Sequence, residues 1–92
     1  MPKLTAAQIK KALASLPGWK RKDASITRLY EFKDFVRAMK FVNDAAKIAE
    51  QANHHPDIDI RWNKVKLTLS THDEGGLTEK DTALARRFNS LA

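Results

Sequence analysis

Residues 35–52 are the segment that most constrains the fold, because they carry a wide apolar stripe at helical spacing. Asp34 is suited to cap the start of such a helix, and Pro56 cannot extend its end. The stripe consists of Phe35, Ala38, Met39, Val42, Ala45, Ala46 and Ala49, with Phe41 and Ile48 off its edge. Its width predicts a helix that is buried on more than one side, against a sheet and against a further subunit.

Segments in which apolar and polar residues alternate, as in β-strands, flank this helix on both sides. Before it, residues 19–22 and 26–32 predict a hairpin whose turn lies at 23–25. After it, residues 58–62 and 65–71 predict a second hairpin, with Asn63-Lys64 as its two-residue turn. Val65, Leu67, Leu69 and Thr71 share the apolar face of the last strand, so His72 has the opposite parity.

Capping signals mark a shorter helix near each end of the chain. Thr5 and Gln8 form a capping box before a helix that Pro17-Gly18 ends, and Thr78 and Asp81 do the same before the last helix. The resulting order is α-β-β-α-β-β-α. We therefore expect one α+β domain over residues 1–92, with two layers and a four-stranded antiparallel sheet covered on one face by helices.

The composition limits the classes of function. The chain has 92 residues, no cysteine and a formal net charge of +6. No segment approaches the ~18 apolar residues of a membrane span, and the N-terminus lacks the apolar core of a secretion signal, so we expect a cytoplasmic protein without membrane contact. The basic residues are scattered and no aromatic residues interleave with them, which argues against a nucleic-acid partner. A domain this small without disulfides gains burial by self-association, so we expect a homo-oligomer.

The three histidines fall in two irregular segments. His54 and His55 directly precede Pro56, and His72 follows the last strand. Imidazole, with an ordinary pKa of ~6.5, both donates and accepts protons near neutral pH. Taken singly, each histidine is more simply explained as a surface residue or a hydrogen-bonded core residue. Their grouping at two irregular points makes a shared acid–base site an equally good explanation.

Other uses of the same residues stay open at this point. Three imidazoles also suit catalytic zinc, but the adjacent His54 and His55 are awkward ligands for one ion, so we expect no metal. Glu50, four residues before His54, either orients a histidine or is a solvated helix carboxylate. Asp81 touches the site or only caps its helix, and capping is the simpler reading. The parity of Trp62 with the isoleucines of its strand favours core or interface packing over an aromatic wall for a ligand.

The spacing of these residues resembles the signature of the pterin-4a-carbinolamine dehydratases. The matching positions are Glu50-Gln51-Ala52-Asn53-His54-His55-Pro56, Trp62, His72 and Asp81, together with Phe32-Lys33-Asp34-Phe35, Asn63-Lys64-Val65, Ser70-Thr71-His72 and Gly76-Leu77-Thr78. The resemblance spans about residues 19–85. Asn53 stands where some members have aspartate, and Trp62 where some have tyrosine.

The resemblance implies the dehydration of 4a-hydroxytetrahydropterin to quinonoid dihydropterin and water, in the recycling of tetrahydrobiopterin or a related pterin, without a cofactor or a metal. It implies that His54, His55 and His72 flank the reacting carbon. We expect His54 to be the base and His55 or His72 the acid. The predicted substrate-binding residues are Asn53, Ser70, Thr71 and Asp73, with Glu50 and Asp81 supporting them.

The same resemblance offers a second role, because some members of the family also act as a dimerisation cofactor of a transcription regulator. The alternative function is therefore a protein-interaction module. The sequence does not select the side chain of the pterin, the hydroxylase served, or a dimer over a tetramer.

Overall fold

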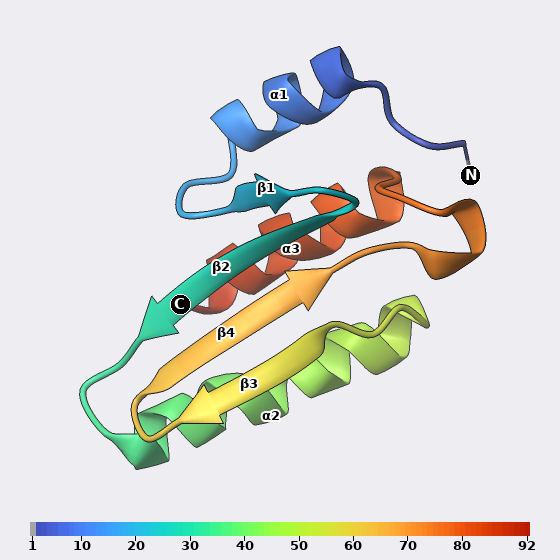
Figure 1. The fold of residues 1–92 in the computed structure, drawn as a ribbon. Coiled ribbons are helices and arrows are strands. Elements are labelled where there is room, and N and C mark those ends of the chain that lie inside the picture. Colours follow the sequence, from blue (N-terminus) through green and yellow to red (C-terminus); the bar gives the residue numbers. More distant parts are fainter. Residues whose placement is uncertain (1) are drawn as a thin grey trace.

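The elements follow one another in the predicted order in a computed structural model that describes residues 2–92. They are α1 (Ala6–Ala14), β1 (Lys20–Lys22), β2 (Ser25–Glu31), α2 (Phe35–Ala52), β3 (Asp57–Arg61), β4 (Lys64–Leu69) and α3 (Glu79–Leu91), with a short 3-10 helix, η1 (His72–Glu74), before α3. Figure 1 shows the strands as one sheet, with α2 and α3 on the same side of it. The predicted α+β class is confirmed.

The sheet is antiparallel throughout and has the order β1-β2-β4-β3, so β2 and β4 are its central strands. The register pairs Ile26 with Leu69 and Tyr30 with Val65, and all four side chains are buried. Because side chains alternate along a strand, they share the face that the helices cover. The opposite face carries polar side chains such as Lys66 and is open to solvent.

Capping bonds fix the helix starts where the sequence predicts them. The Thr5 hydroxyl accepts from the Gln8 amide at 3.1 Å, and the Asp34 carboxylate accepts from the Arg37 amide at 2.9 Å. At α3 the Thr78 side chain and the carboxylate of residue 81 complete a capping box. Each bond satisfies an amide that has no partner within its own helix.

A polar cluster around Asn89 ties α3 to the sheet. The Asn89 Oδ1 atom accepts from Trp19 Nε1 at 2.9 Å, from Arg28 Nη1 at 2.6 Å and from the Tyr30 hydroxyl. The Arg28 guanidinium also lies 4.2 Å from the centre of the Tyr30 ring. These bonds satisfy the polar ends of two buried aromatic side chains.

Within the single chain, three residues of α2 lie differently from the predicted apolar stripe. Phe41, placed off the edge by its spacing, is buried, and its ring centre lies 4.6 Å from that of Tyr30. Phe35 and Ala46, placed in the stripe, are exposed in the single chain. Helical spacing gives the width of an apolar face, whereas the direction in which the sheet crosses the helix decides which edge is covered.

Trp62, predicted to pack in the core or in an interface, is not a core residue of the single chain, and interface packing stays a prediction. Arg61 pairs with Lys64, so the two-residue turn is Trp62-Asn63 rather than Asn63-Lys64. Trp62 has a φ of 49° and its side chain is 66% exposed. The alternation with Ile58 and Ile60 therefore extends one residue beyond the strand. Both isoleucines are themselves partly exposed, because β3 is an edge strand.

Within residues 2–92, none of the helices combines the length and apolar character that crossing a membrane requires.

Candidate active site

The exit from α2 positions His54 and His55. Asn53 adopts a left-handed conformation with a φ of 49°, and the His54 amide donates to the Ala49 carbonyl at 3.1 Å. This is the geometry that often ends helices, and asparagine tolerates it better than most residues. Pro56 then keeps the chain extended into β3. The two histidines therefore lie on a fixed bend rather than on a regular element.

A second bend, after β4, positions His72. Thr71 and Gly76 form an isolated β-bridge, with amide-to-carbonyl distances of 3.0 and 3.3 Å. This bridge closes a tight loop that holds η1, and His72 is the first residue of that helix. The sequence predicts a strand end here but not the 3-10 helix.

The two bends meet at a cavity of about 340 Å³. All three histidines line it, although His72 is 17 residues beyond His55 in the sequence. The full lining consists of Asn53, His54, His55, Ser70, Thr71, His72, Asp73 and Lys80. The fold thus brings together imidazoles from two separate segments around one space.

His54 is held by a buried carboxylate. Its Nε2 atom lies 2.6 Å from Asp81 Oδ1, and the Asp81 side chain is 0% exposed, against 13% for His54. The other carboxylate oxygen, Oδ2, accepts from the Thr71 hydroxyl at 2.7 Å and from the Thr78 amide at 3.0 Å. Because the carboxylate accepts, the Nε2 of His54 carries the proton, and its Nδ1 is left as the basic nitrogen.

His55 and His72 have different surroundings. His55 Nε2 faces the Glu50 carboxylate in a close hydrogen bond, but this pair is exposed, at 57% for His55 and 76% for Glu50. The described residues offer the His72 ring no hydrogen bond or ion pair, and its side chain is exposed. The three imidazoles therefore differ in support: one is fixed in a buried network, one is paired at the surface, and one is free.

The predicted binding residues divide into two groups. Asn53, Ser70, Thr71 and Asp73 line the cavity, whereas Glu50 and Asp81 stand behind the histidines. The Thr71 hydroxyl donates to Asp81, so its own proton is not available to a ligand. Asp81 was predicted either to cap α3 or to touch the site. It does both, because its carboxylate completes the capping box and also contacts His54.

Lys80 lines the cavity and was missed by the sequence analysis. Lys80 lies in the first turn of α3, between the capping residue Thr78 and Asp81. This position could have predicted a place near the cavity, because the first turn of α3 lies close to the network around Asp81. Lys80 brings a positive charge to a cavity otherwise lined by imidazoles and neutral polar groups, apart from Asp73.

Within residues 2–92, no three histidine or acidic side chains are grouped so that they could hold one ion. His54 and His55 each direct Nε2 at a different carboxylate. The absence of a metal requirement stays a prediction.

Fold and cavity together define a small α+β protein with a cavity lined by three histidines. The chain matches the family described as pterin 4 alpha carbinolamine dehydratase over residues 2–91. A relative from Thermomicrobium roseum is 51% identical over 92 residues, which are 100% of this chain and 99% of the relative. One from Acidobacterium capsulatum is 55% identical over 91 residues, 99% of each chain. Both bear the provisional name pterin-4-alpha-carbinolamine dehydratase.

A solved structure has a closely similar fold. The crystal structure of a "transcriptional coactivator/pterin dehydratase" from Brucella melitensis has a TM-score of 0.95 and 42% identity, and the match covers 98% of each chain. This chain belongs to the pterin-4α-carbinolamine dehydratase family. The resemblance and the enzyme class, a lyase that removes water, are confirmed by these matches.

Proposed function

We propose that this protein converts a 4a-hydroxytetrahydropterin to the quinonoid dihydropterin and water by histidine acid–base catalysis. The observation that carries the proposal is the convergence of His54, His55 and His72 on one cavity from two separate bends. Family membership supplies the substrate class.

The reaction needs two proton transfers at neighbouring atoms. An acid protonates the hydroxyl on C4a, and the C4a–O bond breaks as water leaves. The electron pair of N5 forms the C4a=N5 double bond, and a base removes the proton from N5. Each transfer by a positioned side chain contributes roughly 10²–10⁴-fold in rate, so two differently protonated imidazoles suffice for both.

The surroundings of the histidines support distinct roles. His54 is the base, because Asp81 holds its Nε2–H and leaves Nδ1 to accept the proton. The acid is His55 or His72. Glu50 orients His55, and Asn53, Ser70, Thr71 and Asp73 hydrogen-bond the pterin ring.

The cellular setting is proposed from the family resemblance. Quinonoid dihydropterin is the form that recycling reactions reduce, so the protein serves tetrahydrobiopterin or a related pterin used by aromatic amino-acid hydroxylases. A cytoplasmic location and a homo-oligomeric assembly stay predictions of the sequence.

The sharpest test exchanges all three histidines for alanine. We expect dehydration of a 4a-hydroxytetrahydropterin to fall to the uncatalysed rate while circular dichroism and cooperative unfolding stay those of a folded protein. A second triple variant carries His54→Gln, whose amide still donates to Asp81, so that no buried carboxylate is left unpaired. The matched control replaces the exposed Lys10, Lys11 and Lys47 by alanine. Unchanged turnover in the histidine variants would overturn the proposed mechanism.

A second candidate function is an interaction module, and one observation favours it. The similar Brucella melitensis protein is named a transcriptional coactivator as well as a pterin dehydratase. Phe35 and Val36 at the start of α2 are exposed, and a partner would cover such side chains. Copurification of a partner whose binding ignores the histidine exchange, with no dehydratase turnover, would support this role over the enzymatic one.

A further inference from the structure

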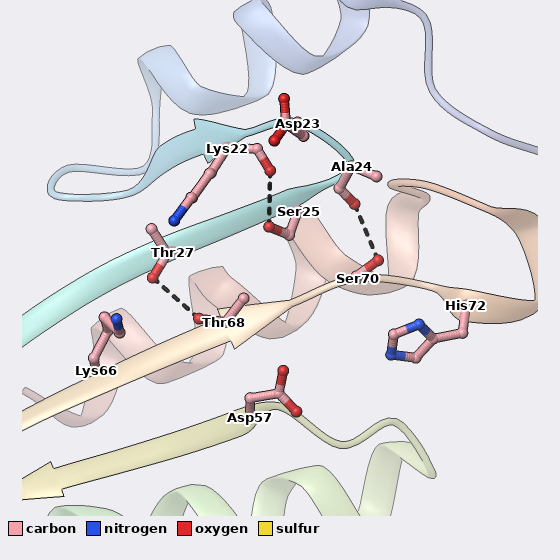
Figure 2. A pocket seen from close by; sticks show the side chains of 10 residues that line it. All are labelled: Lys22, Asp23, Ala24, Ser25, Thr27, Asp57, Lys66, Thr68, Ser70 and His72. Carbon is pink, nitrogen blue, oxygen red and sulfur yellow. Dashed lines mark hydrogen bonds between the residues drawn. The ribbon is translucent and has the colours of Figure 1, made fainter.

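A second hollow, larger than the histidine cavity, lies on the open face of the sheet. Its volume is about 530 Å³, and it shares Ser70 and His72 with the histidine cavity. Figure 2 shows the His72 ring pointing into the same space as Thr68 and Asp57. The two hollows are therefore parts of one continuous surface, and we call the second one the sheet groove.

The register of the strands orders the floor of the sheet groove. Thr27 pairs with Thr68, and Thr68 pairs with Asp57, so the three form one row across β2, β4 and β3. Along β4, Ser70, Thr68 and Lys66 follow one another on the same face at about 6.7 Å per step. A molecule leaving the histidine cavity past Ser70 thus meets the threonine–aspartate row first and Lys66 one step later.

The lining offers hydrogen-bond partners that the chain itself does not use. Among residues 2–92, no hydrogen bond or ion pair engages the charged groups of Lys66, Asp57 or Lys22. The Thr27 hydroxyl donates to the Leu67 carbonyl at 3.0 Å and lies 3.2 Å from the Thr68 hydroxyl. The Thr68 hydroxyl is therefore anchored on one side and retains hydrogen-bonding capacity on the other.

The balance of these groups selects the ligand chemistry. Two lysines and two acidic residues, Asp23 and Asp57, line the sheet groove together with several hydroxyl groups. A phosphate or carboxylate would meet repulsion from the carboxylates as well as attraction from the lysines. Alcohol groups both donate and accept, so a neutral chain carrying several hydroxyls matches the whole set.

We propose that the sheet groove binds a short hydroxylated chain at C6 of the pterin, with Thr68 and Asp57 as the residues that recognise it. This inference rests on the proposed function. C6 is bonded to N5, and N5 to the reacting C4a, so a substituent at C6 starts two bonds from the reacting carbon and leaves the ring beside the histidines. A three-carbon chain spans roughly 4 Å at ordinary carbon–carbon bond lengths, which is less than one ~6.7 Å step along β4. A chain that starts beside Ser70 therefore extends towards the row of Thr68 and Asp57 and stops short of Lys66.

The experiment compares two 4a-hydroxytetrahydropterins, one with a methyl group at C6 and one with a 1,2-dihydroxypropyl chain. We expect wild-type protein to show a KM for the dihydroxypropyl substrate that is lower by about 2- to 10-fold per hydrogen bond. In Asp57→Asn and Thr68→Val this ratio of KM values should shrink towards one. Thr68→Val is mild structurally, because Thr27 keeps its bond to the Leu67 carbonyl. Glu31→Gln makes the same carboxylate-to-amide change on the open face outside the sheet groove, and should keep the wild-type ratio.

Binding of the two unreactive 7,8-dihydropterins with the same chains, measured by titration calorimetry, gives a readout that does not require turnover. Equal affinity for both chains in wild-type protein would overturn the sheet groove as the chain site, even if dehydration proceeds. A preference for the dihydroxypropyl chain without any turnover would support the sheet groove and remove the proposed function instead. Tighter binding of a chain with a terminal phosphate than of the free diol would also overturn the proposal, because it would show an anion site.

Discussion

Replacing Asp81 by asparagine tests how the buried network assigns a role to His54. The carboxylate accepts from the Thr71 hydroxyl and the Thr78 amide on Oδ2 and faces His54 Nε2 with Oδ1. In Asp81→Asn the amide oxygen must stay with the two donors, because an NH₂ group there would face two further donors. The amide nitrogen then points at His54 and donates to Nε2. His54 must carry its proton on Nδ1, so the nitrogen that would accept the pterin proton is lost.

The expected cost falls mainly on catalysis. Loss of a positioned base lowers kcat by about 10²–10⁴-fold. The stability cost is smaller, because the bonds from Thr71 and Thr78 survive but their acceptor becomes neutral. Each such change costs about 1 kcal/mol, or ~2 kcal/mol together, against a usual stability of about 5–15 kcal/mol. The variant should therefore fold and fail to turn over.

The measurement pairs single-turnover dehydration of a 4a-hydroxytetrahydropterin with urea unfolding of the same preparation. Glu79→Gln is the matched control, because it makes an acid-to-amide change at an exposed position of the same helix turn. We expect the control to keep both kcat and the unfolding midpoint. If Asp81→Asn stays folded and kcat falls by less than about threefold, then His54 does not act through a tautomer that Asp81 sets.

Three further predictions concern the scaffold. Asn89→Leu removes the acceptor of the buried Trp19 and Tyr30 donors, so urea unfolding should show a loss of at least about 2 kcal/mol with kcat/KM unchanged. Gly18→Ala should cost about 1–2 kcal/mol in the same assay, because Gly18 has a φ of +86° and an added Cβ would lie 2.4 Å from Arg28 Nε. Burial raises the pKa of the Tyr30 hydroxyl above its ordinary 10.0. The neutral form is therefore favoured in the fold, and its contribution to stability is complete below about pH 10 and is lost as the pH rises through the folded-state pKa. Unfolding titrations should show a steeper alkaline loss in wild-type protein than in Tyr30→Phe, and parallel curves would contradict this.

The fold was largely predictable from the sequence because its signals are local. Capping boxes at Thr5 and Thr78 and the helix from Phe35 to Ala52 appear where expected. The residues that lie differently from their prediction depend on how the strands pair and pack with other elements. Phe41 is buried because β2 brings Tyr30 against it, and Trp62 is exposed because the turn begins one residue early. The spacing of apolar residues within one segment predicts neither the burial of Phe41 nor the exposure of Trp62.

The candidate site was predictable in its residue types but not in its pairings. Three histidines in two irregular segments identified the region, and the cavity contains all of them. The pairing of His54 with Asp81 depends on the packing of α3 against α2, and the residues alone favoured Asp81 as a cap. The pairing of His55 with Glu50 depends on the bend at the end of α2, and the residues alone left Glu50 open between orienting a histidine and being solvated. The lining role of Lys80 has the same origin.

In the proposed mechanism, the contrast between the two histidine–carboxylate pairs favours different places for the two proton transfers. The pair of His54 and Asp81 is buried, so it holds one orientation and suits the transfer from a ring nitrogen fixed in the cavity. The pair of His55 and Glu50 is exposed, and surface pairs of this kind contribute little energy and hold their geometry weakly. Each turnover leaves the base protonated and the acid deprotonated, so the protons must be restored before the next substrate reacts. An exposed acid recovers its proton directly from water, whereas a buried acid would need a relay. The acid is therefore expected among the exposed histidines, and the base at the end of α2 where Asp81 fixes the ring.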